Sequence, residues 1–262
     1  MRVLVLGVYR EPSGYGVAAT NTILALHAAG ADVACRPLQY TPGGETAHPV
    51  LKELERKTFP AGPDVTLQYA PPYAYQYLKA GGLNVGYFFA ETTPLPYSWA
   101  ARANLMDLLL VPNRDMAAAM AGEPHFHKPV EVVGVPQDPA RYAAAYAPPA
   151  CVTQAKRGGR FVFYAVGEWV RRKNFSGLLK AYFAAFRPWE PVTLLLKTSI
   201  PGLGAAEARE VVLRDVELVR HGCKLRQTPR VDIATERLTE DELCGLHQHR
   251  DRKSTRLNSS HW

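Results

Sequence analysis

The chain has 262 residues, of which 47% are hydrophobic and 21% charged, and its formal net charge is +7. These values are typical of an ordinary globular protein, and the length suits one large or two modest domains. No apolar run approaches the ~20 residues of a membrane span, and no aromatic-interleaved basic ribbon or nucleic-acid motif is present. The composition therefore argues against membrane-spanning and nucleic-acid-binding proteins. A modest positive charge suits anionic small molecules, or a peripheral contact with a membrane surface.

The chain begins with an apolar strand, and this start does not resemble a signal sequence. The expected strands of the first half are residues 2–8, 31–38, 65–69, 84–89, 107–112 and 130–135. The helices expected between them are Val17–Ala29, which Gly30 would stop, Val50–Lys57, Tyr73–Lys79 and Arg114–Ala121. Alternating strands and helices predict βαβ units and a parallel sheet, hence an α/β fold. Residues 1–135 are expected to form a complete Rossmann-like domain.

Residues 136–160 are rich in proline and glycine and are expected to form an interdomain linker. The βα rhythm restarts with an apolar run at Phe161–Val166. Further elements are expected at 192–198, 205–221 and 231–234, followed by a helix that begins with the capping box Thr239–Glu242. Residues 161–250 therefore make only part of a typical second Rossmann-like domain.

Residues 251–262, DRKSTRLNSSHW, share no pattern with the rest of the chain. The stretch Asp251–His261 resembles the in-frame translation of a widely used sequencing adapter, so the tail is interpreted as non-native and set aside. The alternative is a disordered native tail. Without its net charge of +2, the formal charge falls from +7 to +5. We expect the natural protein to continue beyond Arg250.

Cysteine and histidine usage does not predict a metal site. The four cysteines, Cys35, Cys151, Cys223 and Cys244, form no Cys-x-x-Cys pair and are expected to be buried thiols in a reducing cytoplasm. The pairs His125/His127 and His247/His249 have poor metal-ligand spacing and are interpreted as surface histidines. We expect neither a metal nor a cofactor.

The most informative segment is residues 161–186, FVFYAVGEWVRRKNFSGLLKAYFAAF. It places Arg171, Arg172 and Lys173 at a strand-to-helix turn, where helix N–H groups also favour a phosphate. The segment resembles the turn that opens the second domain of family-four glycosyltransferases, retaining enzymes of the GT-B fold. Gly167 and Lys173 match the spacing of the family's Gly-Arg-(four residues)-Lys-Gly pattern. Glu168 stands in place of its Arg, and Asn174 in place of its second Gly.

The resemblance implies roles for residues of this turn and of the next strand. Arg172 and Lys173, with Arg171 as a weaker third, would hold the diphosphate of a nucleotide-sugar donor. Lys197 and Thr198, at the end of the next strand, could also face the cleft. The alternative is a solvated basic surface turn.

Two segments of the first domain strengthen the resemblance. The loop Ser13–Gly16 and the run 86–99, GYFFAETTPLPYSW, are similar to acceptor-side segments of the family. By this resemblance Gly14 and Gly16 would approach the ligand closely, and Glu91 would accept acceptor hydroxyls. Alternatively, the loop is a turn with no ligand, and Glu91 caps a helix or pairs with an arginine. Asn113 replaces a serine of the family pattern.

The residues also allow other functions to be considered. A dinucleotide site is disfavoured because Gly-x-Gly-x-x-Gly and the acidic residue after the second strand are missing. The family's Glu-(seven residues)-Glu motif does not occur before Arg250. The resemblance predicts a glycosyltransferase fragment, inactive as truncated, that takes a nucleotide-diphosphate sugar and an unknown acceptor. A GT-B nucleotide-sugar epimerase and a non-catalytic nucleotide- or carbohydrate-binding module are the alternatives.

Overall fold

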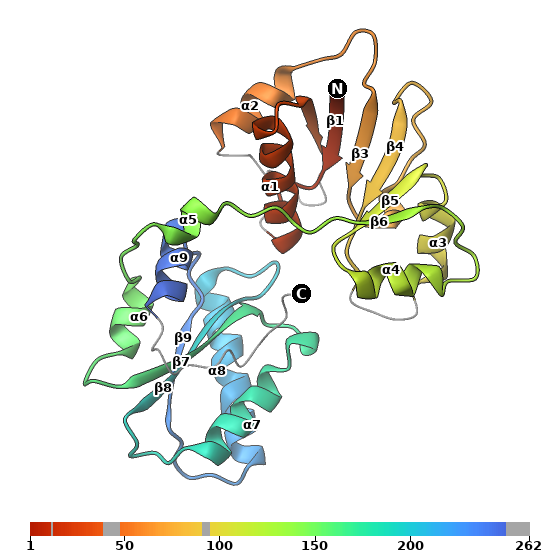
Figure 1. Cartoon of the computed structure of the whole chain (residues 1–262). Coiled ribbons are helices and arrows are strands. Elements are labelled where there is room, and N and C mark those ends of the chain that lie inside the picture. Colours follow the sequence, from red (N-terminus) through yellow and green to blue (C-terminus); the bar gives the residue numbers. More distant parts are fainter. Residues whose placement is uncertain (12, 39–47, 91–94, 250–262) are drawn as a thin grey trace. The chain divides into compact units, whose positions relative to one another are not determined.

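The computed structural model describes residues 1–11, 13–38, 48–90 and 95–249 (Figure 1). The chain divides into two compact units, Met1–Pro139 and Ala140–Trp262. The stretch 136–160, predicted as a linker, includes two short helices, α5 (Pro139–Ala143) and α6 (Ala150–Ala155).

The first unit is built on a parallel sheet with the strand order β2-β1-β3-β4-β5-β6. Its strands are β1 (Arg2–Gly7), β2 (Asp32–Pro37), β3 (Val65–Tyr69), β4 (Leu83–Tyr87), β5 (Leu108–Val111) and β6 (Val130–Val132). β1 lies between β2 and β3, so that Val3 pairs with Val33 on one side and with Val65 on the other. Five of these strands fall within segments predicted from their apolar runs, and β4 begins one residue before its predicted segment, 84–89.

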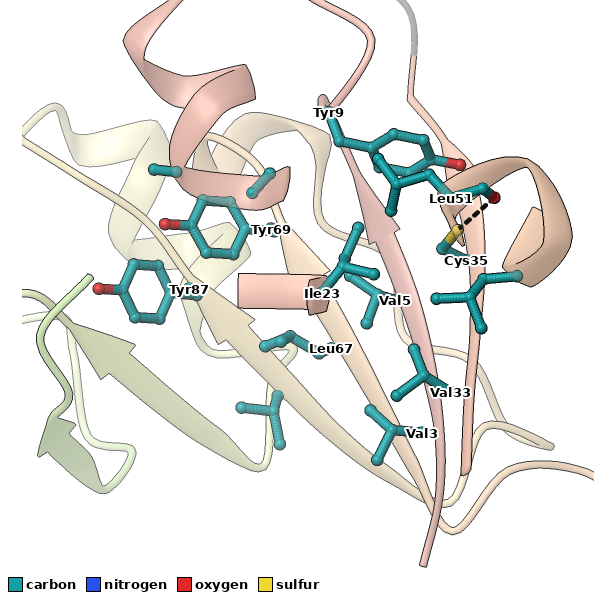
Figure 2. Close-up of a cluster of buried hydrophobic side chains, with 14 residues drawn as sticks. Val3, Val5, Tyr9, Ile23, Val33, Cys35, Leu51, Leu67, Tyr69 and Tyr87 are labelled. Carbon is teal, nitrogen blue, oxygen red and sulfur yellow. Dashed lines mark hydrogen bonds between the residues drawn. The ribbon is translucent and has the colours of Figure 1, made fainter. Parts of the chain in front are cut away.

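Helices cover both faces of this sheet (Figure 1). On one face α1 (Gly14–Ala28) and α2 (Pro49–Arg56) pack over a core that includes Val3, Val5 and Ile23 (Figure 2). On the other face α3 (Tyr97–Ala103) and α4 (Arg114–Ala121) enclose a second apolar core with Phe88, Met106 and Leu109. Along β5 the side chains alternate between the two cores, because Leu108 and Leu110 pack against the first core and Leu109 and Val111 lie in the second.

The helix predicted at Tyr73–Lys79 is wrong. Only the short 3-10 turn η1 (Pro72–Ala74) forms there. The buried side chain of Gln68 on β3 accepts a hydrogen bond from the Gln76 backbone N–H at 3.0 Å, and Asn84 Oδ1 on β4 accepts one from the Leu78 N–H at 3.0 Å. These two strand residues satisfy backbone groups that a helix would otherwise pair, so the segment stays extended.

The second unit contains a parallel sheet with the order β7-β8-β9, formed by β7 (Phe161–Glu168), β8 (Val192–Ser199) and β9 (Arg230–Ala234). One face packs against α7 (Phe175–Ala185) and α8 (Ala205–Gly222) through a core that includes Leu179, Phe183 and Leu196. The other face packs against α6 and α9 (Glu240–Gln248).

The capping box at the start of α9 is confirmed. The Thr239 hydroxyl accepts a hydrogen bond from the Glu242 N–H at 3.2 Å, and the Glu242 carboxylate accepts one from the Thr239 N–H at 2.8 Å. These two bonds satisfy N–H groups that the first turn of a helix leaves unpaired. Leu246, on the buried side of α9, is 1% exposed and packs against Val162 and Tyr164 of β7.

Candidate functional site

The basic turn, residues Arg171–Lys173, forms a short 3-10 helix, η2, between β7 and α7. Trp169 anchors this turn. Its backbone N–H donates to the Ser199 carbonyl at 2.8 Å, and its indole Nε1–H donates to Asp215 Oδ2 on α8 at 2.7 Å. The indole ring also stacks on Phe175 of α7, with ring centroids 4.5 Å apart. Contacts of Trp169 with β8, α8 and α7 therefore fix the position of the basic turn.

Within the basic turn, Lys173 lies against the end of β7. A β-carbon built on Gly167 would lie 3.9 Å from Cγ, Cδ and Cε of Lys173, so the aliphatic part of this side chain runs along the glycine. Arg171 and Arg172 are exposed. The sequence-predicted residues Arg172 and Lys173 are thus neighbours at the carboxyl end of a parallel strand, where α/β folds commonly bind ligands.

Asn174 ends the basic turn and begins α7. Its backbone is left-handed, with φ of 50°, a conformation that glycine adopts most easily and that asparagine tolerates better than most residues. Its Oδ1 accepts a hydrogen bond from the Gly177 N–H at 3.2 Å and caps the helix. A β-carbon at Gly177 would lie 2.6 Å from the Asn174 amide nitrogen, so this glycine makes room for the cap. Asn174 can therefore occupy the place where the resembled pattern has glycine.

Lys197 and Thr198 follow each other at the end of β8 and point to opposite faces of the sheet. Thr198 is opposite Gly167 in the strand register. Lys197 is half-buried, and burial lowers the pKa of its ammonium, with Cys151 and Glu236 nearby favouring the charged form. Only Thr198 shares the sheet face of Gly167 and the Lys173 stem.

In the first unit, the segment Ser13–Gly16 forms the start of α1. Ser13 is the N-cap, and its hydroxyl accepts a hydrogen bond from the Gly16 N–H at 3.2 Å. A β-carbon on Gly16 would lie 2.0 Å from the Glu11 carbonyl oxygen, whereas one on Gly14 would meet nothing within 4 Å. Neither glycine has a positive φ. The structure therefore gives Gly16 a packing reason to be glycine and gives none to Gly14.

Tyr15 joins the Ser13–Gly16 loop to the end of β4. Its hydroxyl accepts a hydrogen bond from the Phe89 N–H at 2.9 Å, and its ring meets Phe89 edge-on at 4.8 Å. The chain then leads toward Glu91, a predicted acceptor-binding residue that lies outside the described residues. Asn113, which replaces a serine of the resembled pattern, is the N-cap of α4 and accepts from the Met116 N–H at 2.8 Å.

A half-buried ion pair beside the end of β1 had not been predicted. Arg10 donates to both carboxylate oxygens of Glu55 on α2, at 3.0 and 2.7 Å, and the Tyr9 hydroxyl donates to the same carboxylate at 3.0 Å. Burial raises the pKa of Glu55, but the bonds from Arg10 and Tyr9 outweigh it, and the net pKa is lowered. Burial also raises the pKa values of Tyr9 and Cys35. The charged residues are far apart in sequence, so no local pattern marks the pair.

The cysteines and histidines are only partly as predicted. All four cysteines are free thiols, with Cys35 and Cys244 buried and the other two half-buried. His125 and His127 are exposed, as predicted, but His247 and His249 are half-buried. His247 Nδ1 is 3.1 Å from the Tyr164 hydroxyl, and His249 Nε2 is 2.7 Å from the Tyr146 carbonyl.

Neither a metal-binding cluster nor a membrane-spanning helix is found among the described residues. Among them, no group of three or more His, Cys, Asp and Glu side chains could hold a metal ion. No helix in this part of the chain has both the length and the apolar character needed to cross a membrane.

Comparison with known proteins gives matches only at the level of solved structures. No protein-family model and no curated protein matches the chain. A structure described as trehalose-6-phosphate from E. coli bound with UDP-2-fluoro glucose matches with a TM-score of 0.62 and 15% identity, over 96% of this chain and 77% of that one. Anabaena HepE in complex with UDP and glucose matches with a TM-score of 0.57 and 15% identity, over 96% and 72% of the two chains.

A trehalose-phosphate synthase is a third match. The Burkholderia xenovorans α,α-trehalose-phosphate synthase (UDP-forming), in complex with glucose-6-phosphate, has a TM-score of 0.58 and 10% identity, over 95% of this chain and 78% of that one. These neighbours are GT-B glycosyltransferases, and identities this low establish the fold alone. The predicted fold class is confirmed: the chain has the α/β fold with parallel sheets of GT-B glycosyltransferase structures.

Proposed function

We propose that this protein is a glycosyltransferase that takes its sugar from a nucleotide-diphosphate donor, with retention at the anomeric carbon, as family-four enzymes do. The observation that supports it best is the basic turn: Lys173 lies along Gly167 at the end of β7, and Trp169 holds the turn against α7 and α8. Structures of similar fold contain UDP or a UDP-sugar analogue, which agrees with a diphosphate at such a turn.

The chemistry follows from the charge that a departing nucleoside diphosphate accumulates. As the bond between the anomeric carbon and the diphosphate oxygen breaks, negative charge grows on that oxygen. Cations that are already in position stabilise this charge without reorganising solvent. Lys173 would meet the diphosphate as a point charge, while Arg172 can offer two parallel N–H donors to phosphate oxygens. The acceptor would bind to the first unit, near Gly14, Gly16 and Glu91.

Binding of UDP, measured by isothermal titration calorimetry, tests the proposal because it does not depend on turnover. A charge-assisted hydrogen bond contributes about 1.5–3 kcal/mol, so Lys173→Ala and Arg172→Ala should each weaken UDP binding by about tenfold or more. Arg171→Ala should weaken binding less. Lys180→Ala is the matched control, because Lys180 is an exposed lysine on α7 outside the turn.

ADP and GDP, titrated in parallel, identify the preferred base. Because the family's Glu-(seven residues)-Glu motif does not occur before Arg250, this chain is expected to bind UDP without turnover, and release of UDP from UDP-glucose in the presence of candidate acceptors would contradict that expectation. Conversion of the donor sugar without an acceptor would instead indicate an epimerase. Affinities that are equal in the wild type, Lys173→Ala and Lys180→Ala would contradict the assignment of the diphosphate to the basic turn.

A further inference from the structure

We propose that the hydroxyl of Thr198 is a further binding group for the diphosphate, donating a hydrogen bond to a phosphate oxygen held at the basic turn. This inference rests on the proposed function, because it needs an anion at that turn. It adds to the site an uncharged side chain that comes from the neighbouring strand.

The position of Thr198 follows from the strand register. Gly167 at the end of β7 pairs with Thr198 of β8, so the two residues are adjacent in the sheet. Side chains of register partners on parallel strands point to the same face. The Lys173 stem lies along that face of Gly167, at 3.9 Å from a β-carbon built there. The hydroxyl of Thr198 is therefore on the same side of the sheet as the Lys173 side chain and the start of α7.

The second observation is the hydrogen bonding of Thr198 itself. The residue is 2% exposed, and its Oγ1 is buried with no hydrogen-bond partner in the described part of the chain. Two other buried threonines, Thr66 and Thr235, are satisfied: Thr66 donates to the Gly81 carbonyl at 2.7 Å and Thr235 to the Ala205 carbonyl at 2.8 Å. A buried hydroxyl without a partner destabilises the fold, and a bound ligand is one way to supply the missing partner.

The missing side chain of Gly167 leaves room for an anion next to the Thr198 hydroxyl. Because Gly167 has no side chain, the flexible stem of Lys173 can lie over the strand end beside Thr198, and its carbons are the nearest atoms to a β-carbon built on Gly167. When the Lys173 ammonium extends to a phosphate, its stem can move while the strands stay in place. A phosphate oxygen can then reach both the ammonium and the threonine hydroxyl. The side chain of Thr198 is already buried, at 2% exposure, so binding costs little ordering of this side chain.

The same strand supplies a matched control. Thr193 is 0% exposed, and its Oγ1 also has no partner within the described residues. It lies near the start of β8, opposite Val162, and its side chain points to the other face of the sheet. Thr193 therefore shares the burial and the unsatisfied hydroxyl of Thr198, but it is remote from the basic turn.

The experiment compares Thr198→Val, Thr193→Val and Thr198→Ser in the full chain. UDP and inorganic pyrophosphate are titrated by calorimetry, and thermal unfolding is followed in parallel. Valine keeps the shape of threonine and removes the hydroxyl, so neither valine variant should melt at a lower temperature than the wild type. Thr198→Val should weaken binding of both ligands by about tenfold. Thr193→Val should leave both affinities unchanged, and Thr198→Ser should keep most of the wild-type affinity.

The outcomes separate this inference from the proposed function. Wild-type affinity in Thr198→Val, together with weakened binding in Lys173→Ala, would overturn the role of Thr198 and leave the proposed function standing. If both Thr198→Val and Lys173→Ala bind with wild-type affinity, or if the wild type does not bind, the role of Thr198 and the proposed function are both contradicted. If Thr198→Val does not fold, Thr198→Ala provides the same comparison. An equal loss of affinity in Thr193→Val and Thr198→Val would also overturn the inference, because it would indicate an indirect effect through the sheet.

Discussion

The hydroxyl oxygen of Tyr15 accepts a hydrogen bond from the backbone N–H of Phe89 at 2.9 Å, joining residues 74 positions apart. It connects the first turn of α1 with the segment that follows β4. The Tyr15 ring also meets Tyr69 edge-on at 5.9 Å, and Tyr69 stacks on Tyr87 at 4.5 Å. A row of aromatic rings thus holds the Ser13–Gly16 loop against the carboxyl ends of β3 and β4.

Replacement of Tyr15 by phenylalanine removes this acceptor and keeps the ring. We expect Tyr15→Phe to lower the free energy of unfolding of the first unit by about 1 kcal/mol, because a half-buried N–H loses its partner. The Phe89 amide should then exchange with solvent deuterium about five- to tenfold faster, as measured by NMR. Tyr77→Phe, at an exposed tyrosine, is the control and should change neither quantity. Unchanged exchange at Phe89 would mean that the hydrogen bond contributes nothing.

The two glycines of the first loop should respond differently to the same substitution. Gly16→Ala would place a β-carbon 2.0 Å from the Glu11 carbonyl oxygen, so the loop or the start of α1 must move. We expect a loss of about 2 kcal/mol in the free energy of unfolding, measured by urea denaturation. Gly14→Ala meets nothing within 4 Å and should be neutral or slightly stabilising, because alanine favours the helix. Equal effects of the two substitutions would contradict this packing.

The sequence predicted the helices and strands well where a local pattern of apolar residues decides the structure. The apolar runs predicted every strand of both sheets, and the change of period after Gly167 correctly predicted α7. Arg172 and Lys173 could be placed at a strand-to-helix turn because a turn of this kind depends on neighbouring residues. α3 was missed, since it is short, follows prolines and has no side-chain N-cap.

Long-range contacts could not be predicted in the same way. Gln68 and Asn84 hold the segment after η1 by side-chain bonds to its backbone, and periodicity alone does not reveal such partners. The same is true of the bond from Trp169 to Asp215, which spans 46 positions and fixes the basic turn. The sequence therefore identified the cations of the candidate site, while the residues that position them became visible only in the fold.

The ion pair of Arg10 and Glu55 predicts a loss of stability in acid. The net pKa of Glu55 is below its ordinary value of about 4.3, although burial alone would raise it. A group with a lowered pKa in the folded state stabilises the fold above its unfolded pKa, and this contribution is lost as the pH falls through the folded pKa. Glu55→Gln should cost about 2 kcal/mol at neutral pH, and the difference from the wild type should shrink below about pH 4.

Asp64 provides the control for this acid titration. Its hydrogen bonds with Arg2 lower its pKa to about 2, and it is exposed. Asp64→Asn should therefore affect the stability profile mainly between about pH 4 and about pH 2. Urea denaturation at a series of pH values measures both profiles. A difference between Glu55→Gln and the wild type that stays constant from neutral pH to about pH 3 would contradict the role of the Glu55 charge.

The hydrogen bond from Trp169 to Asp215 should affect UDP binding indirectly, through the position of the basic turn. Asp215→Ala leaves the indole N–H without its acceptor, so the second unit should lose about 1–3 kcal/mol of unfolding free energy. Because Trp169 also stacks on Phe175, the turn should stay folded, but the positions of its cations should be less well defined. UDP binding should therefore weaken about three- to tenfold.

The control variants keep the acceptor or lie outside the contact. Asp215→Asn keeps an oxygen acceptor, so its stability and its UDP affinity should lie between those of Asp215→Ala and the wild type. Glu210→Ala, an exposed position on the same helix, is the control. The indole N–H resonance of Trp169 reports the bond directly, and an unchanged resonance in Asp215→Ala would show that Asp215 does not hold the turn.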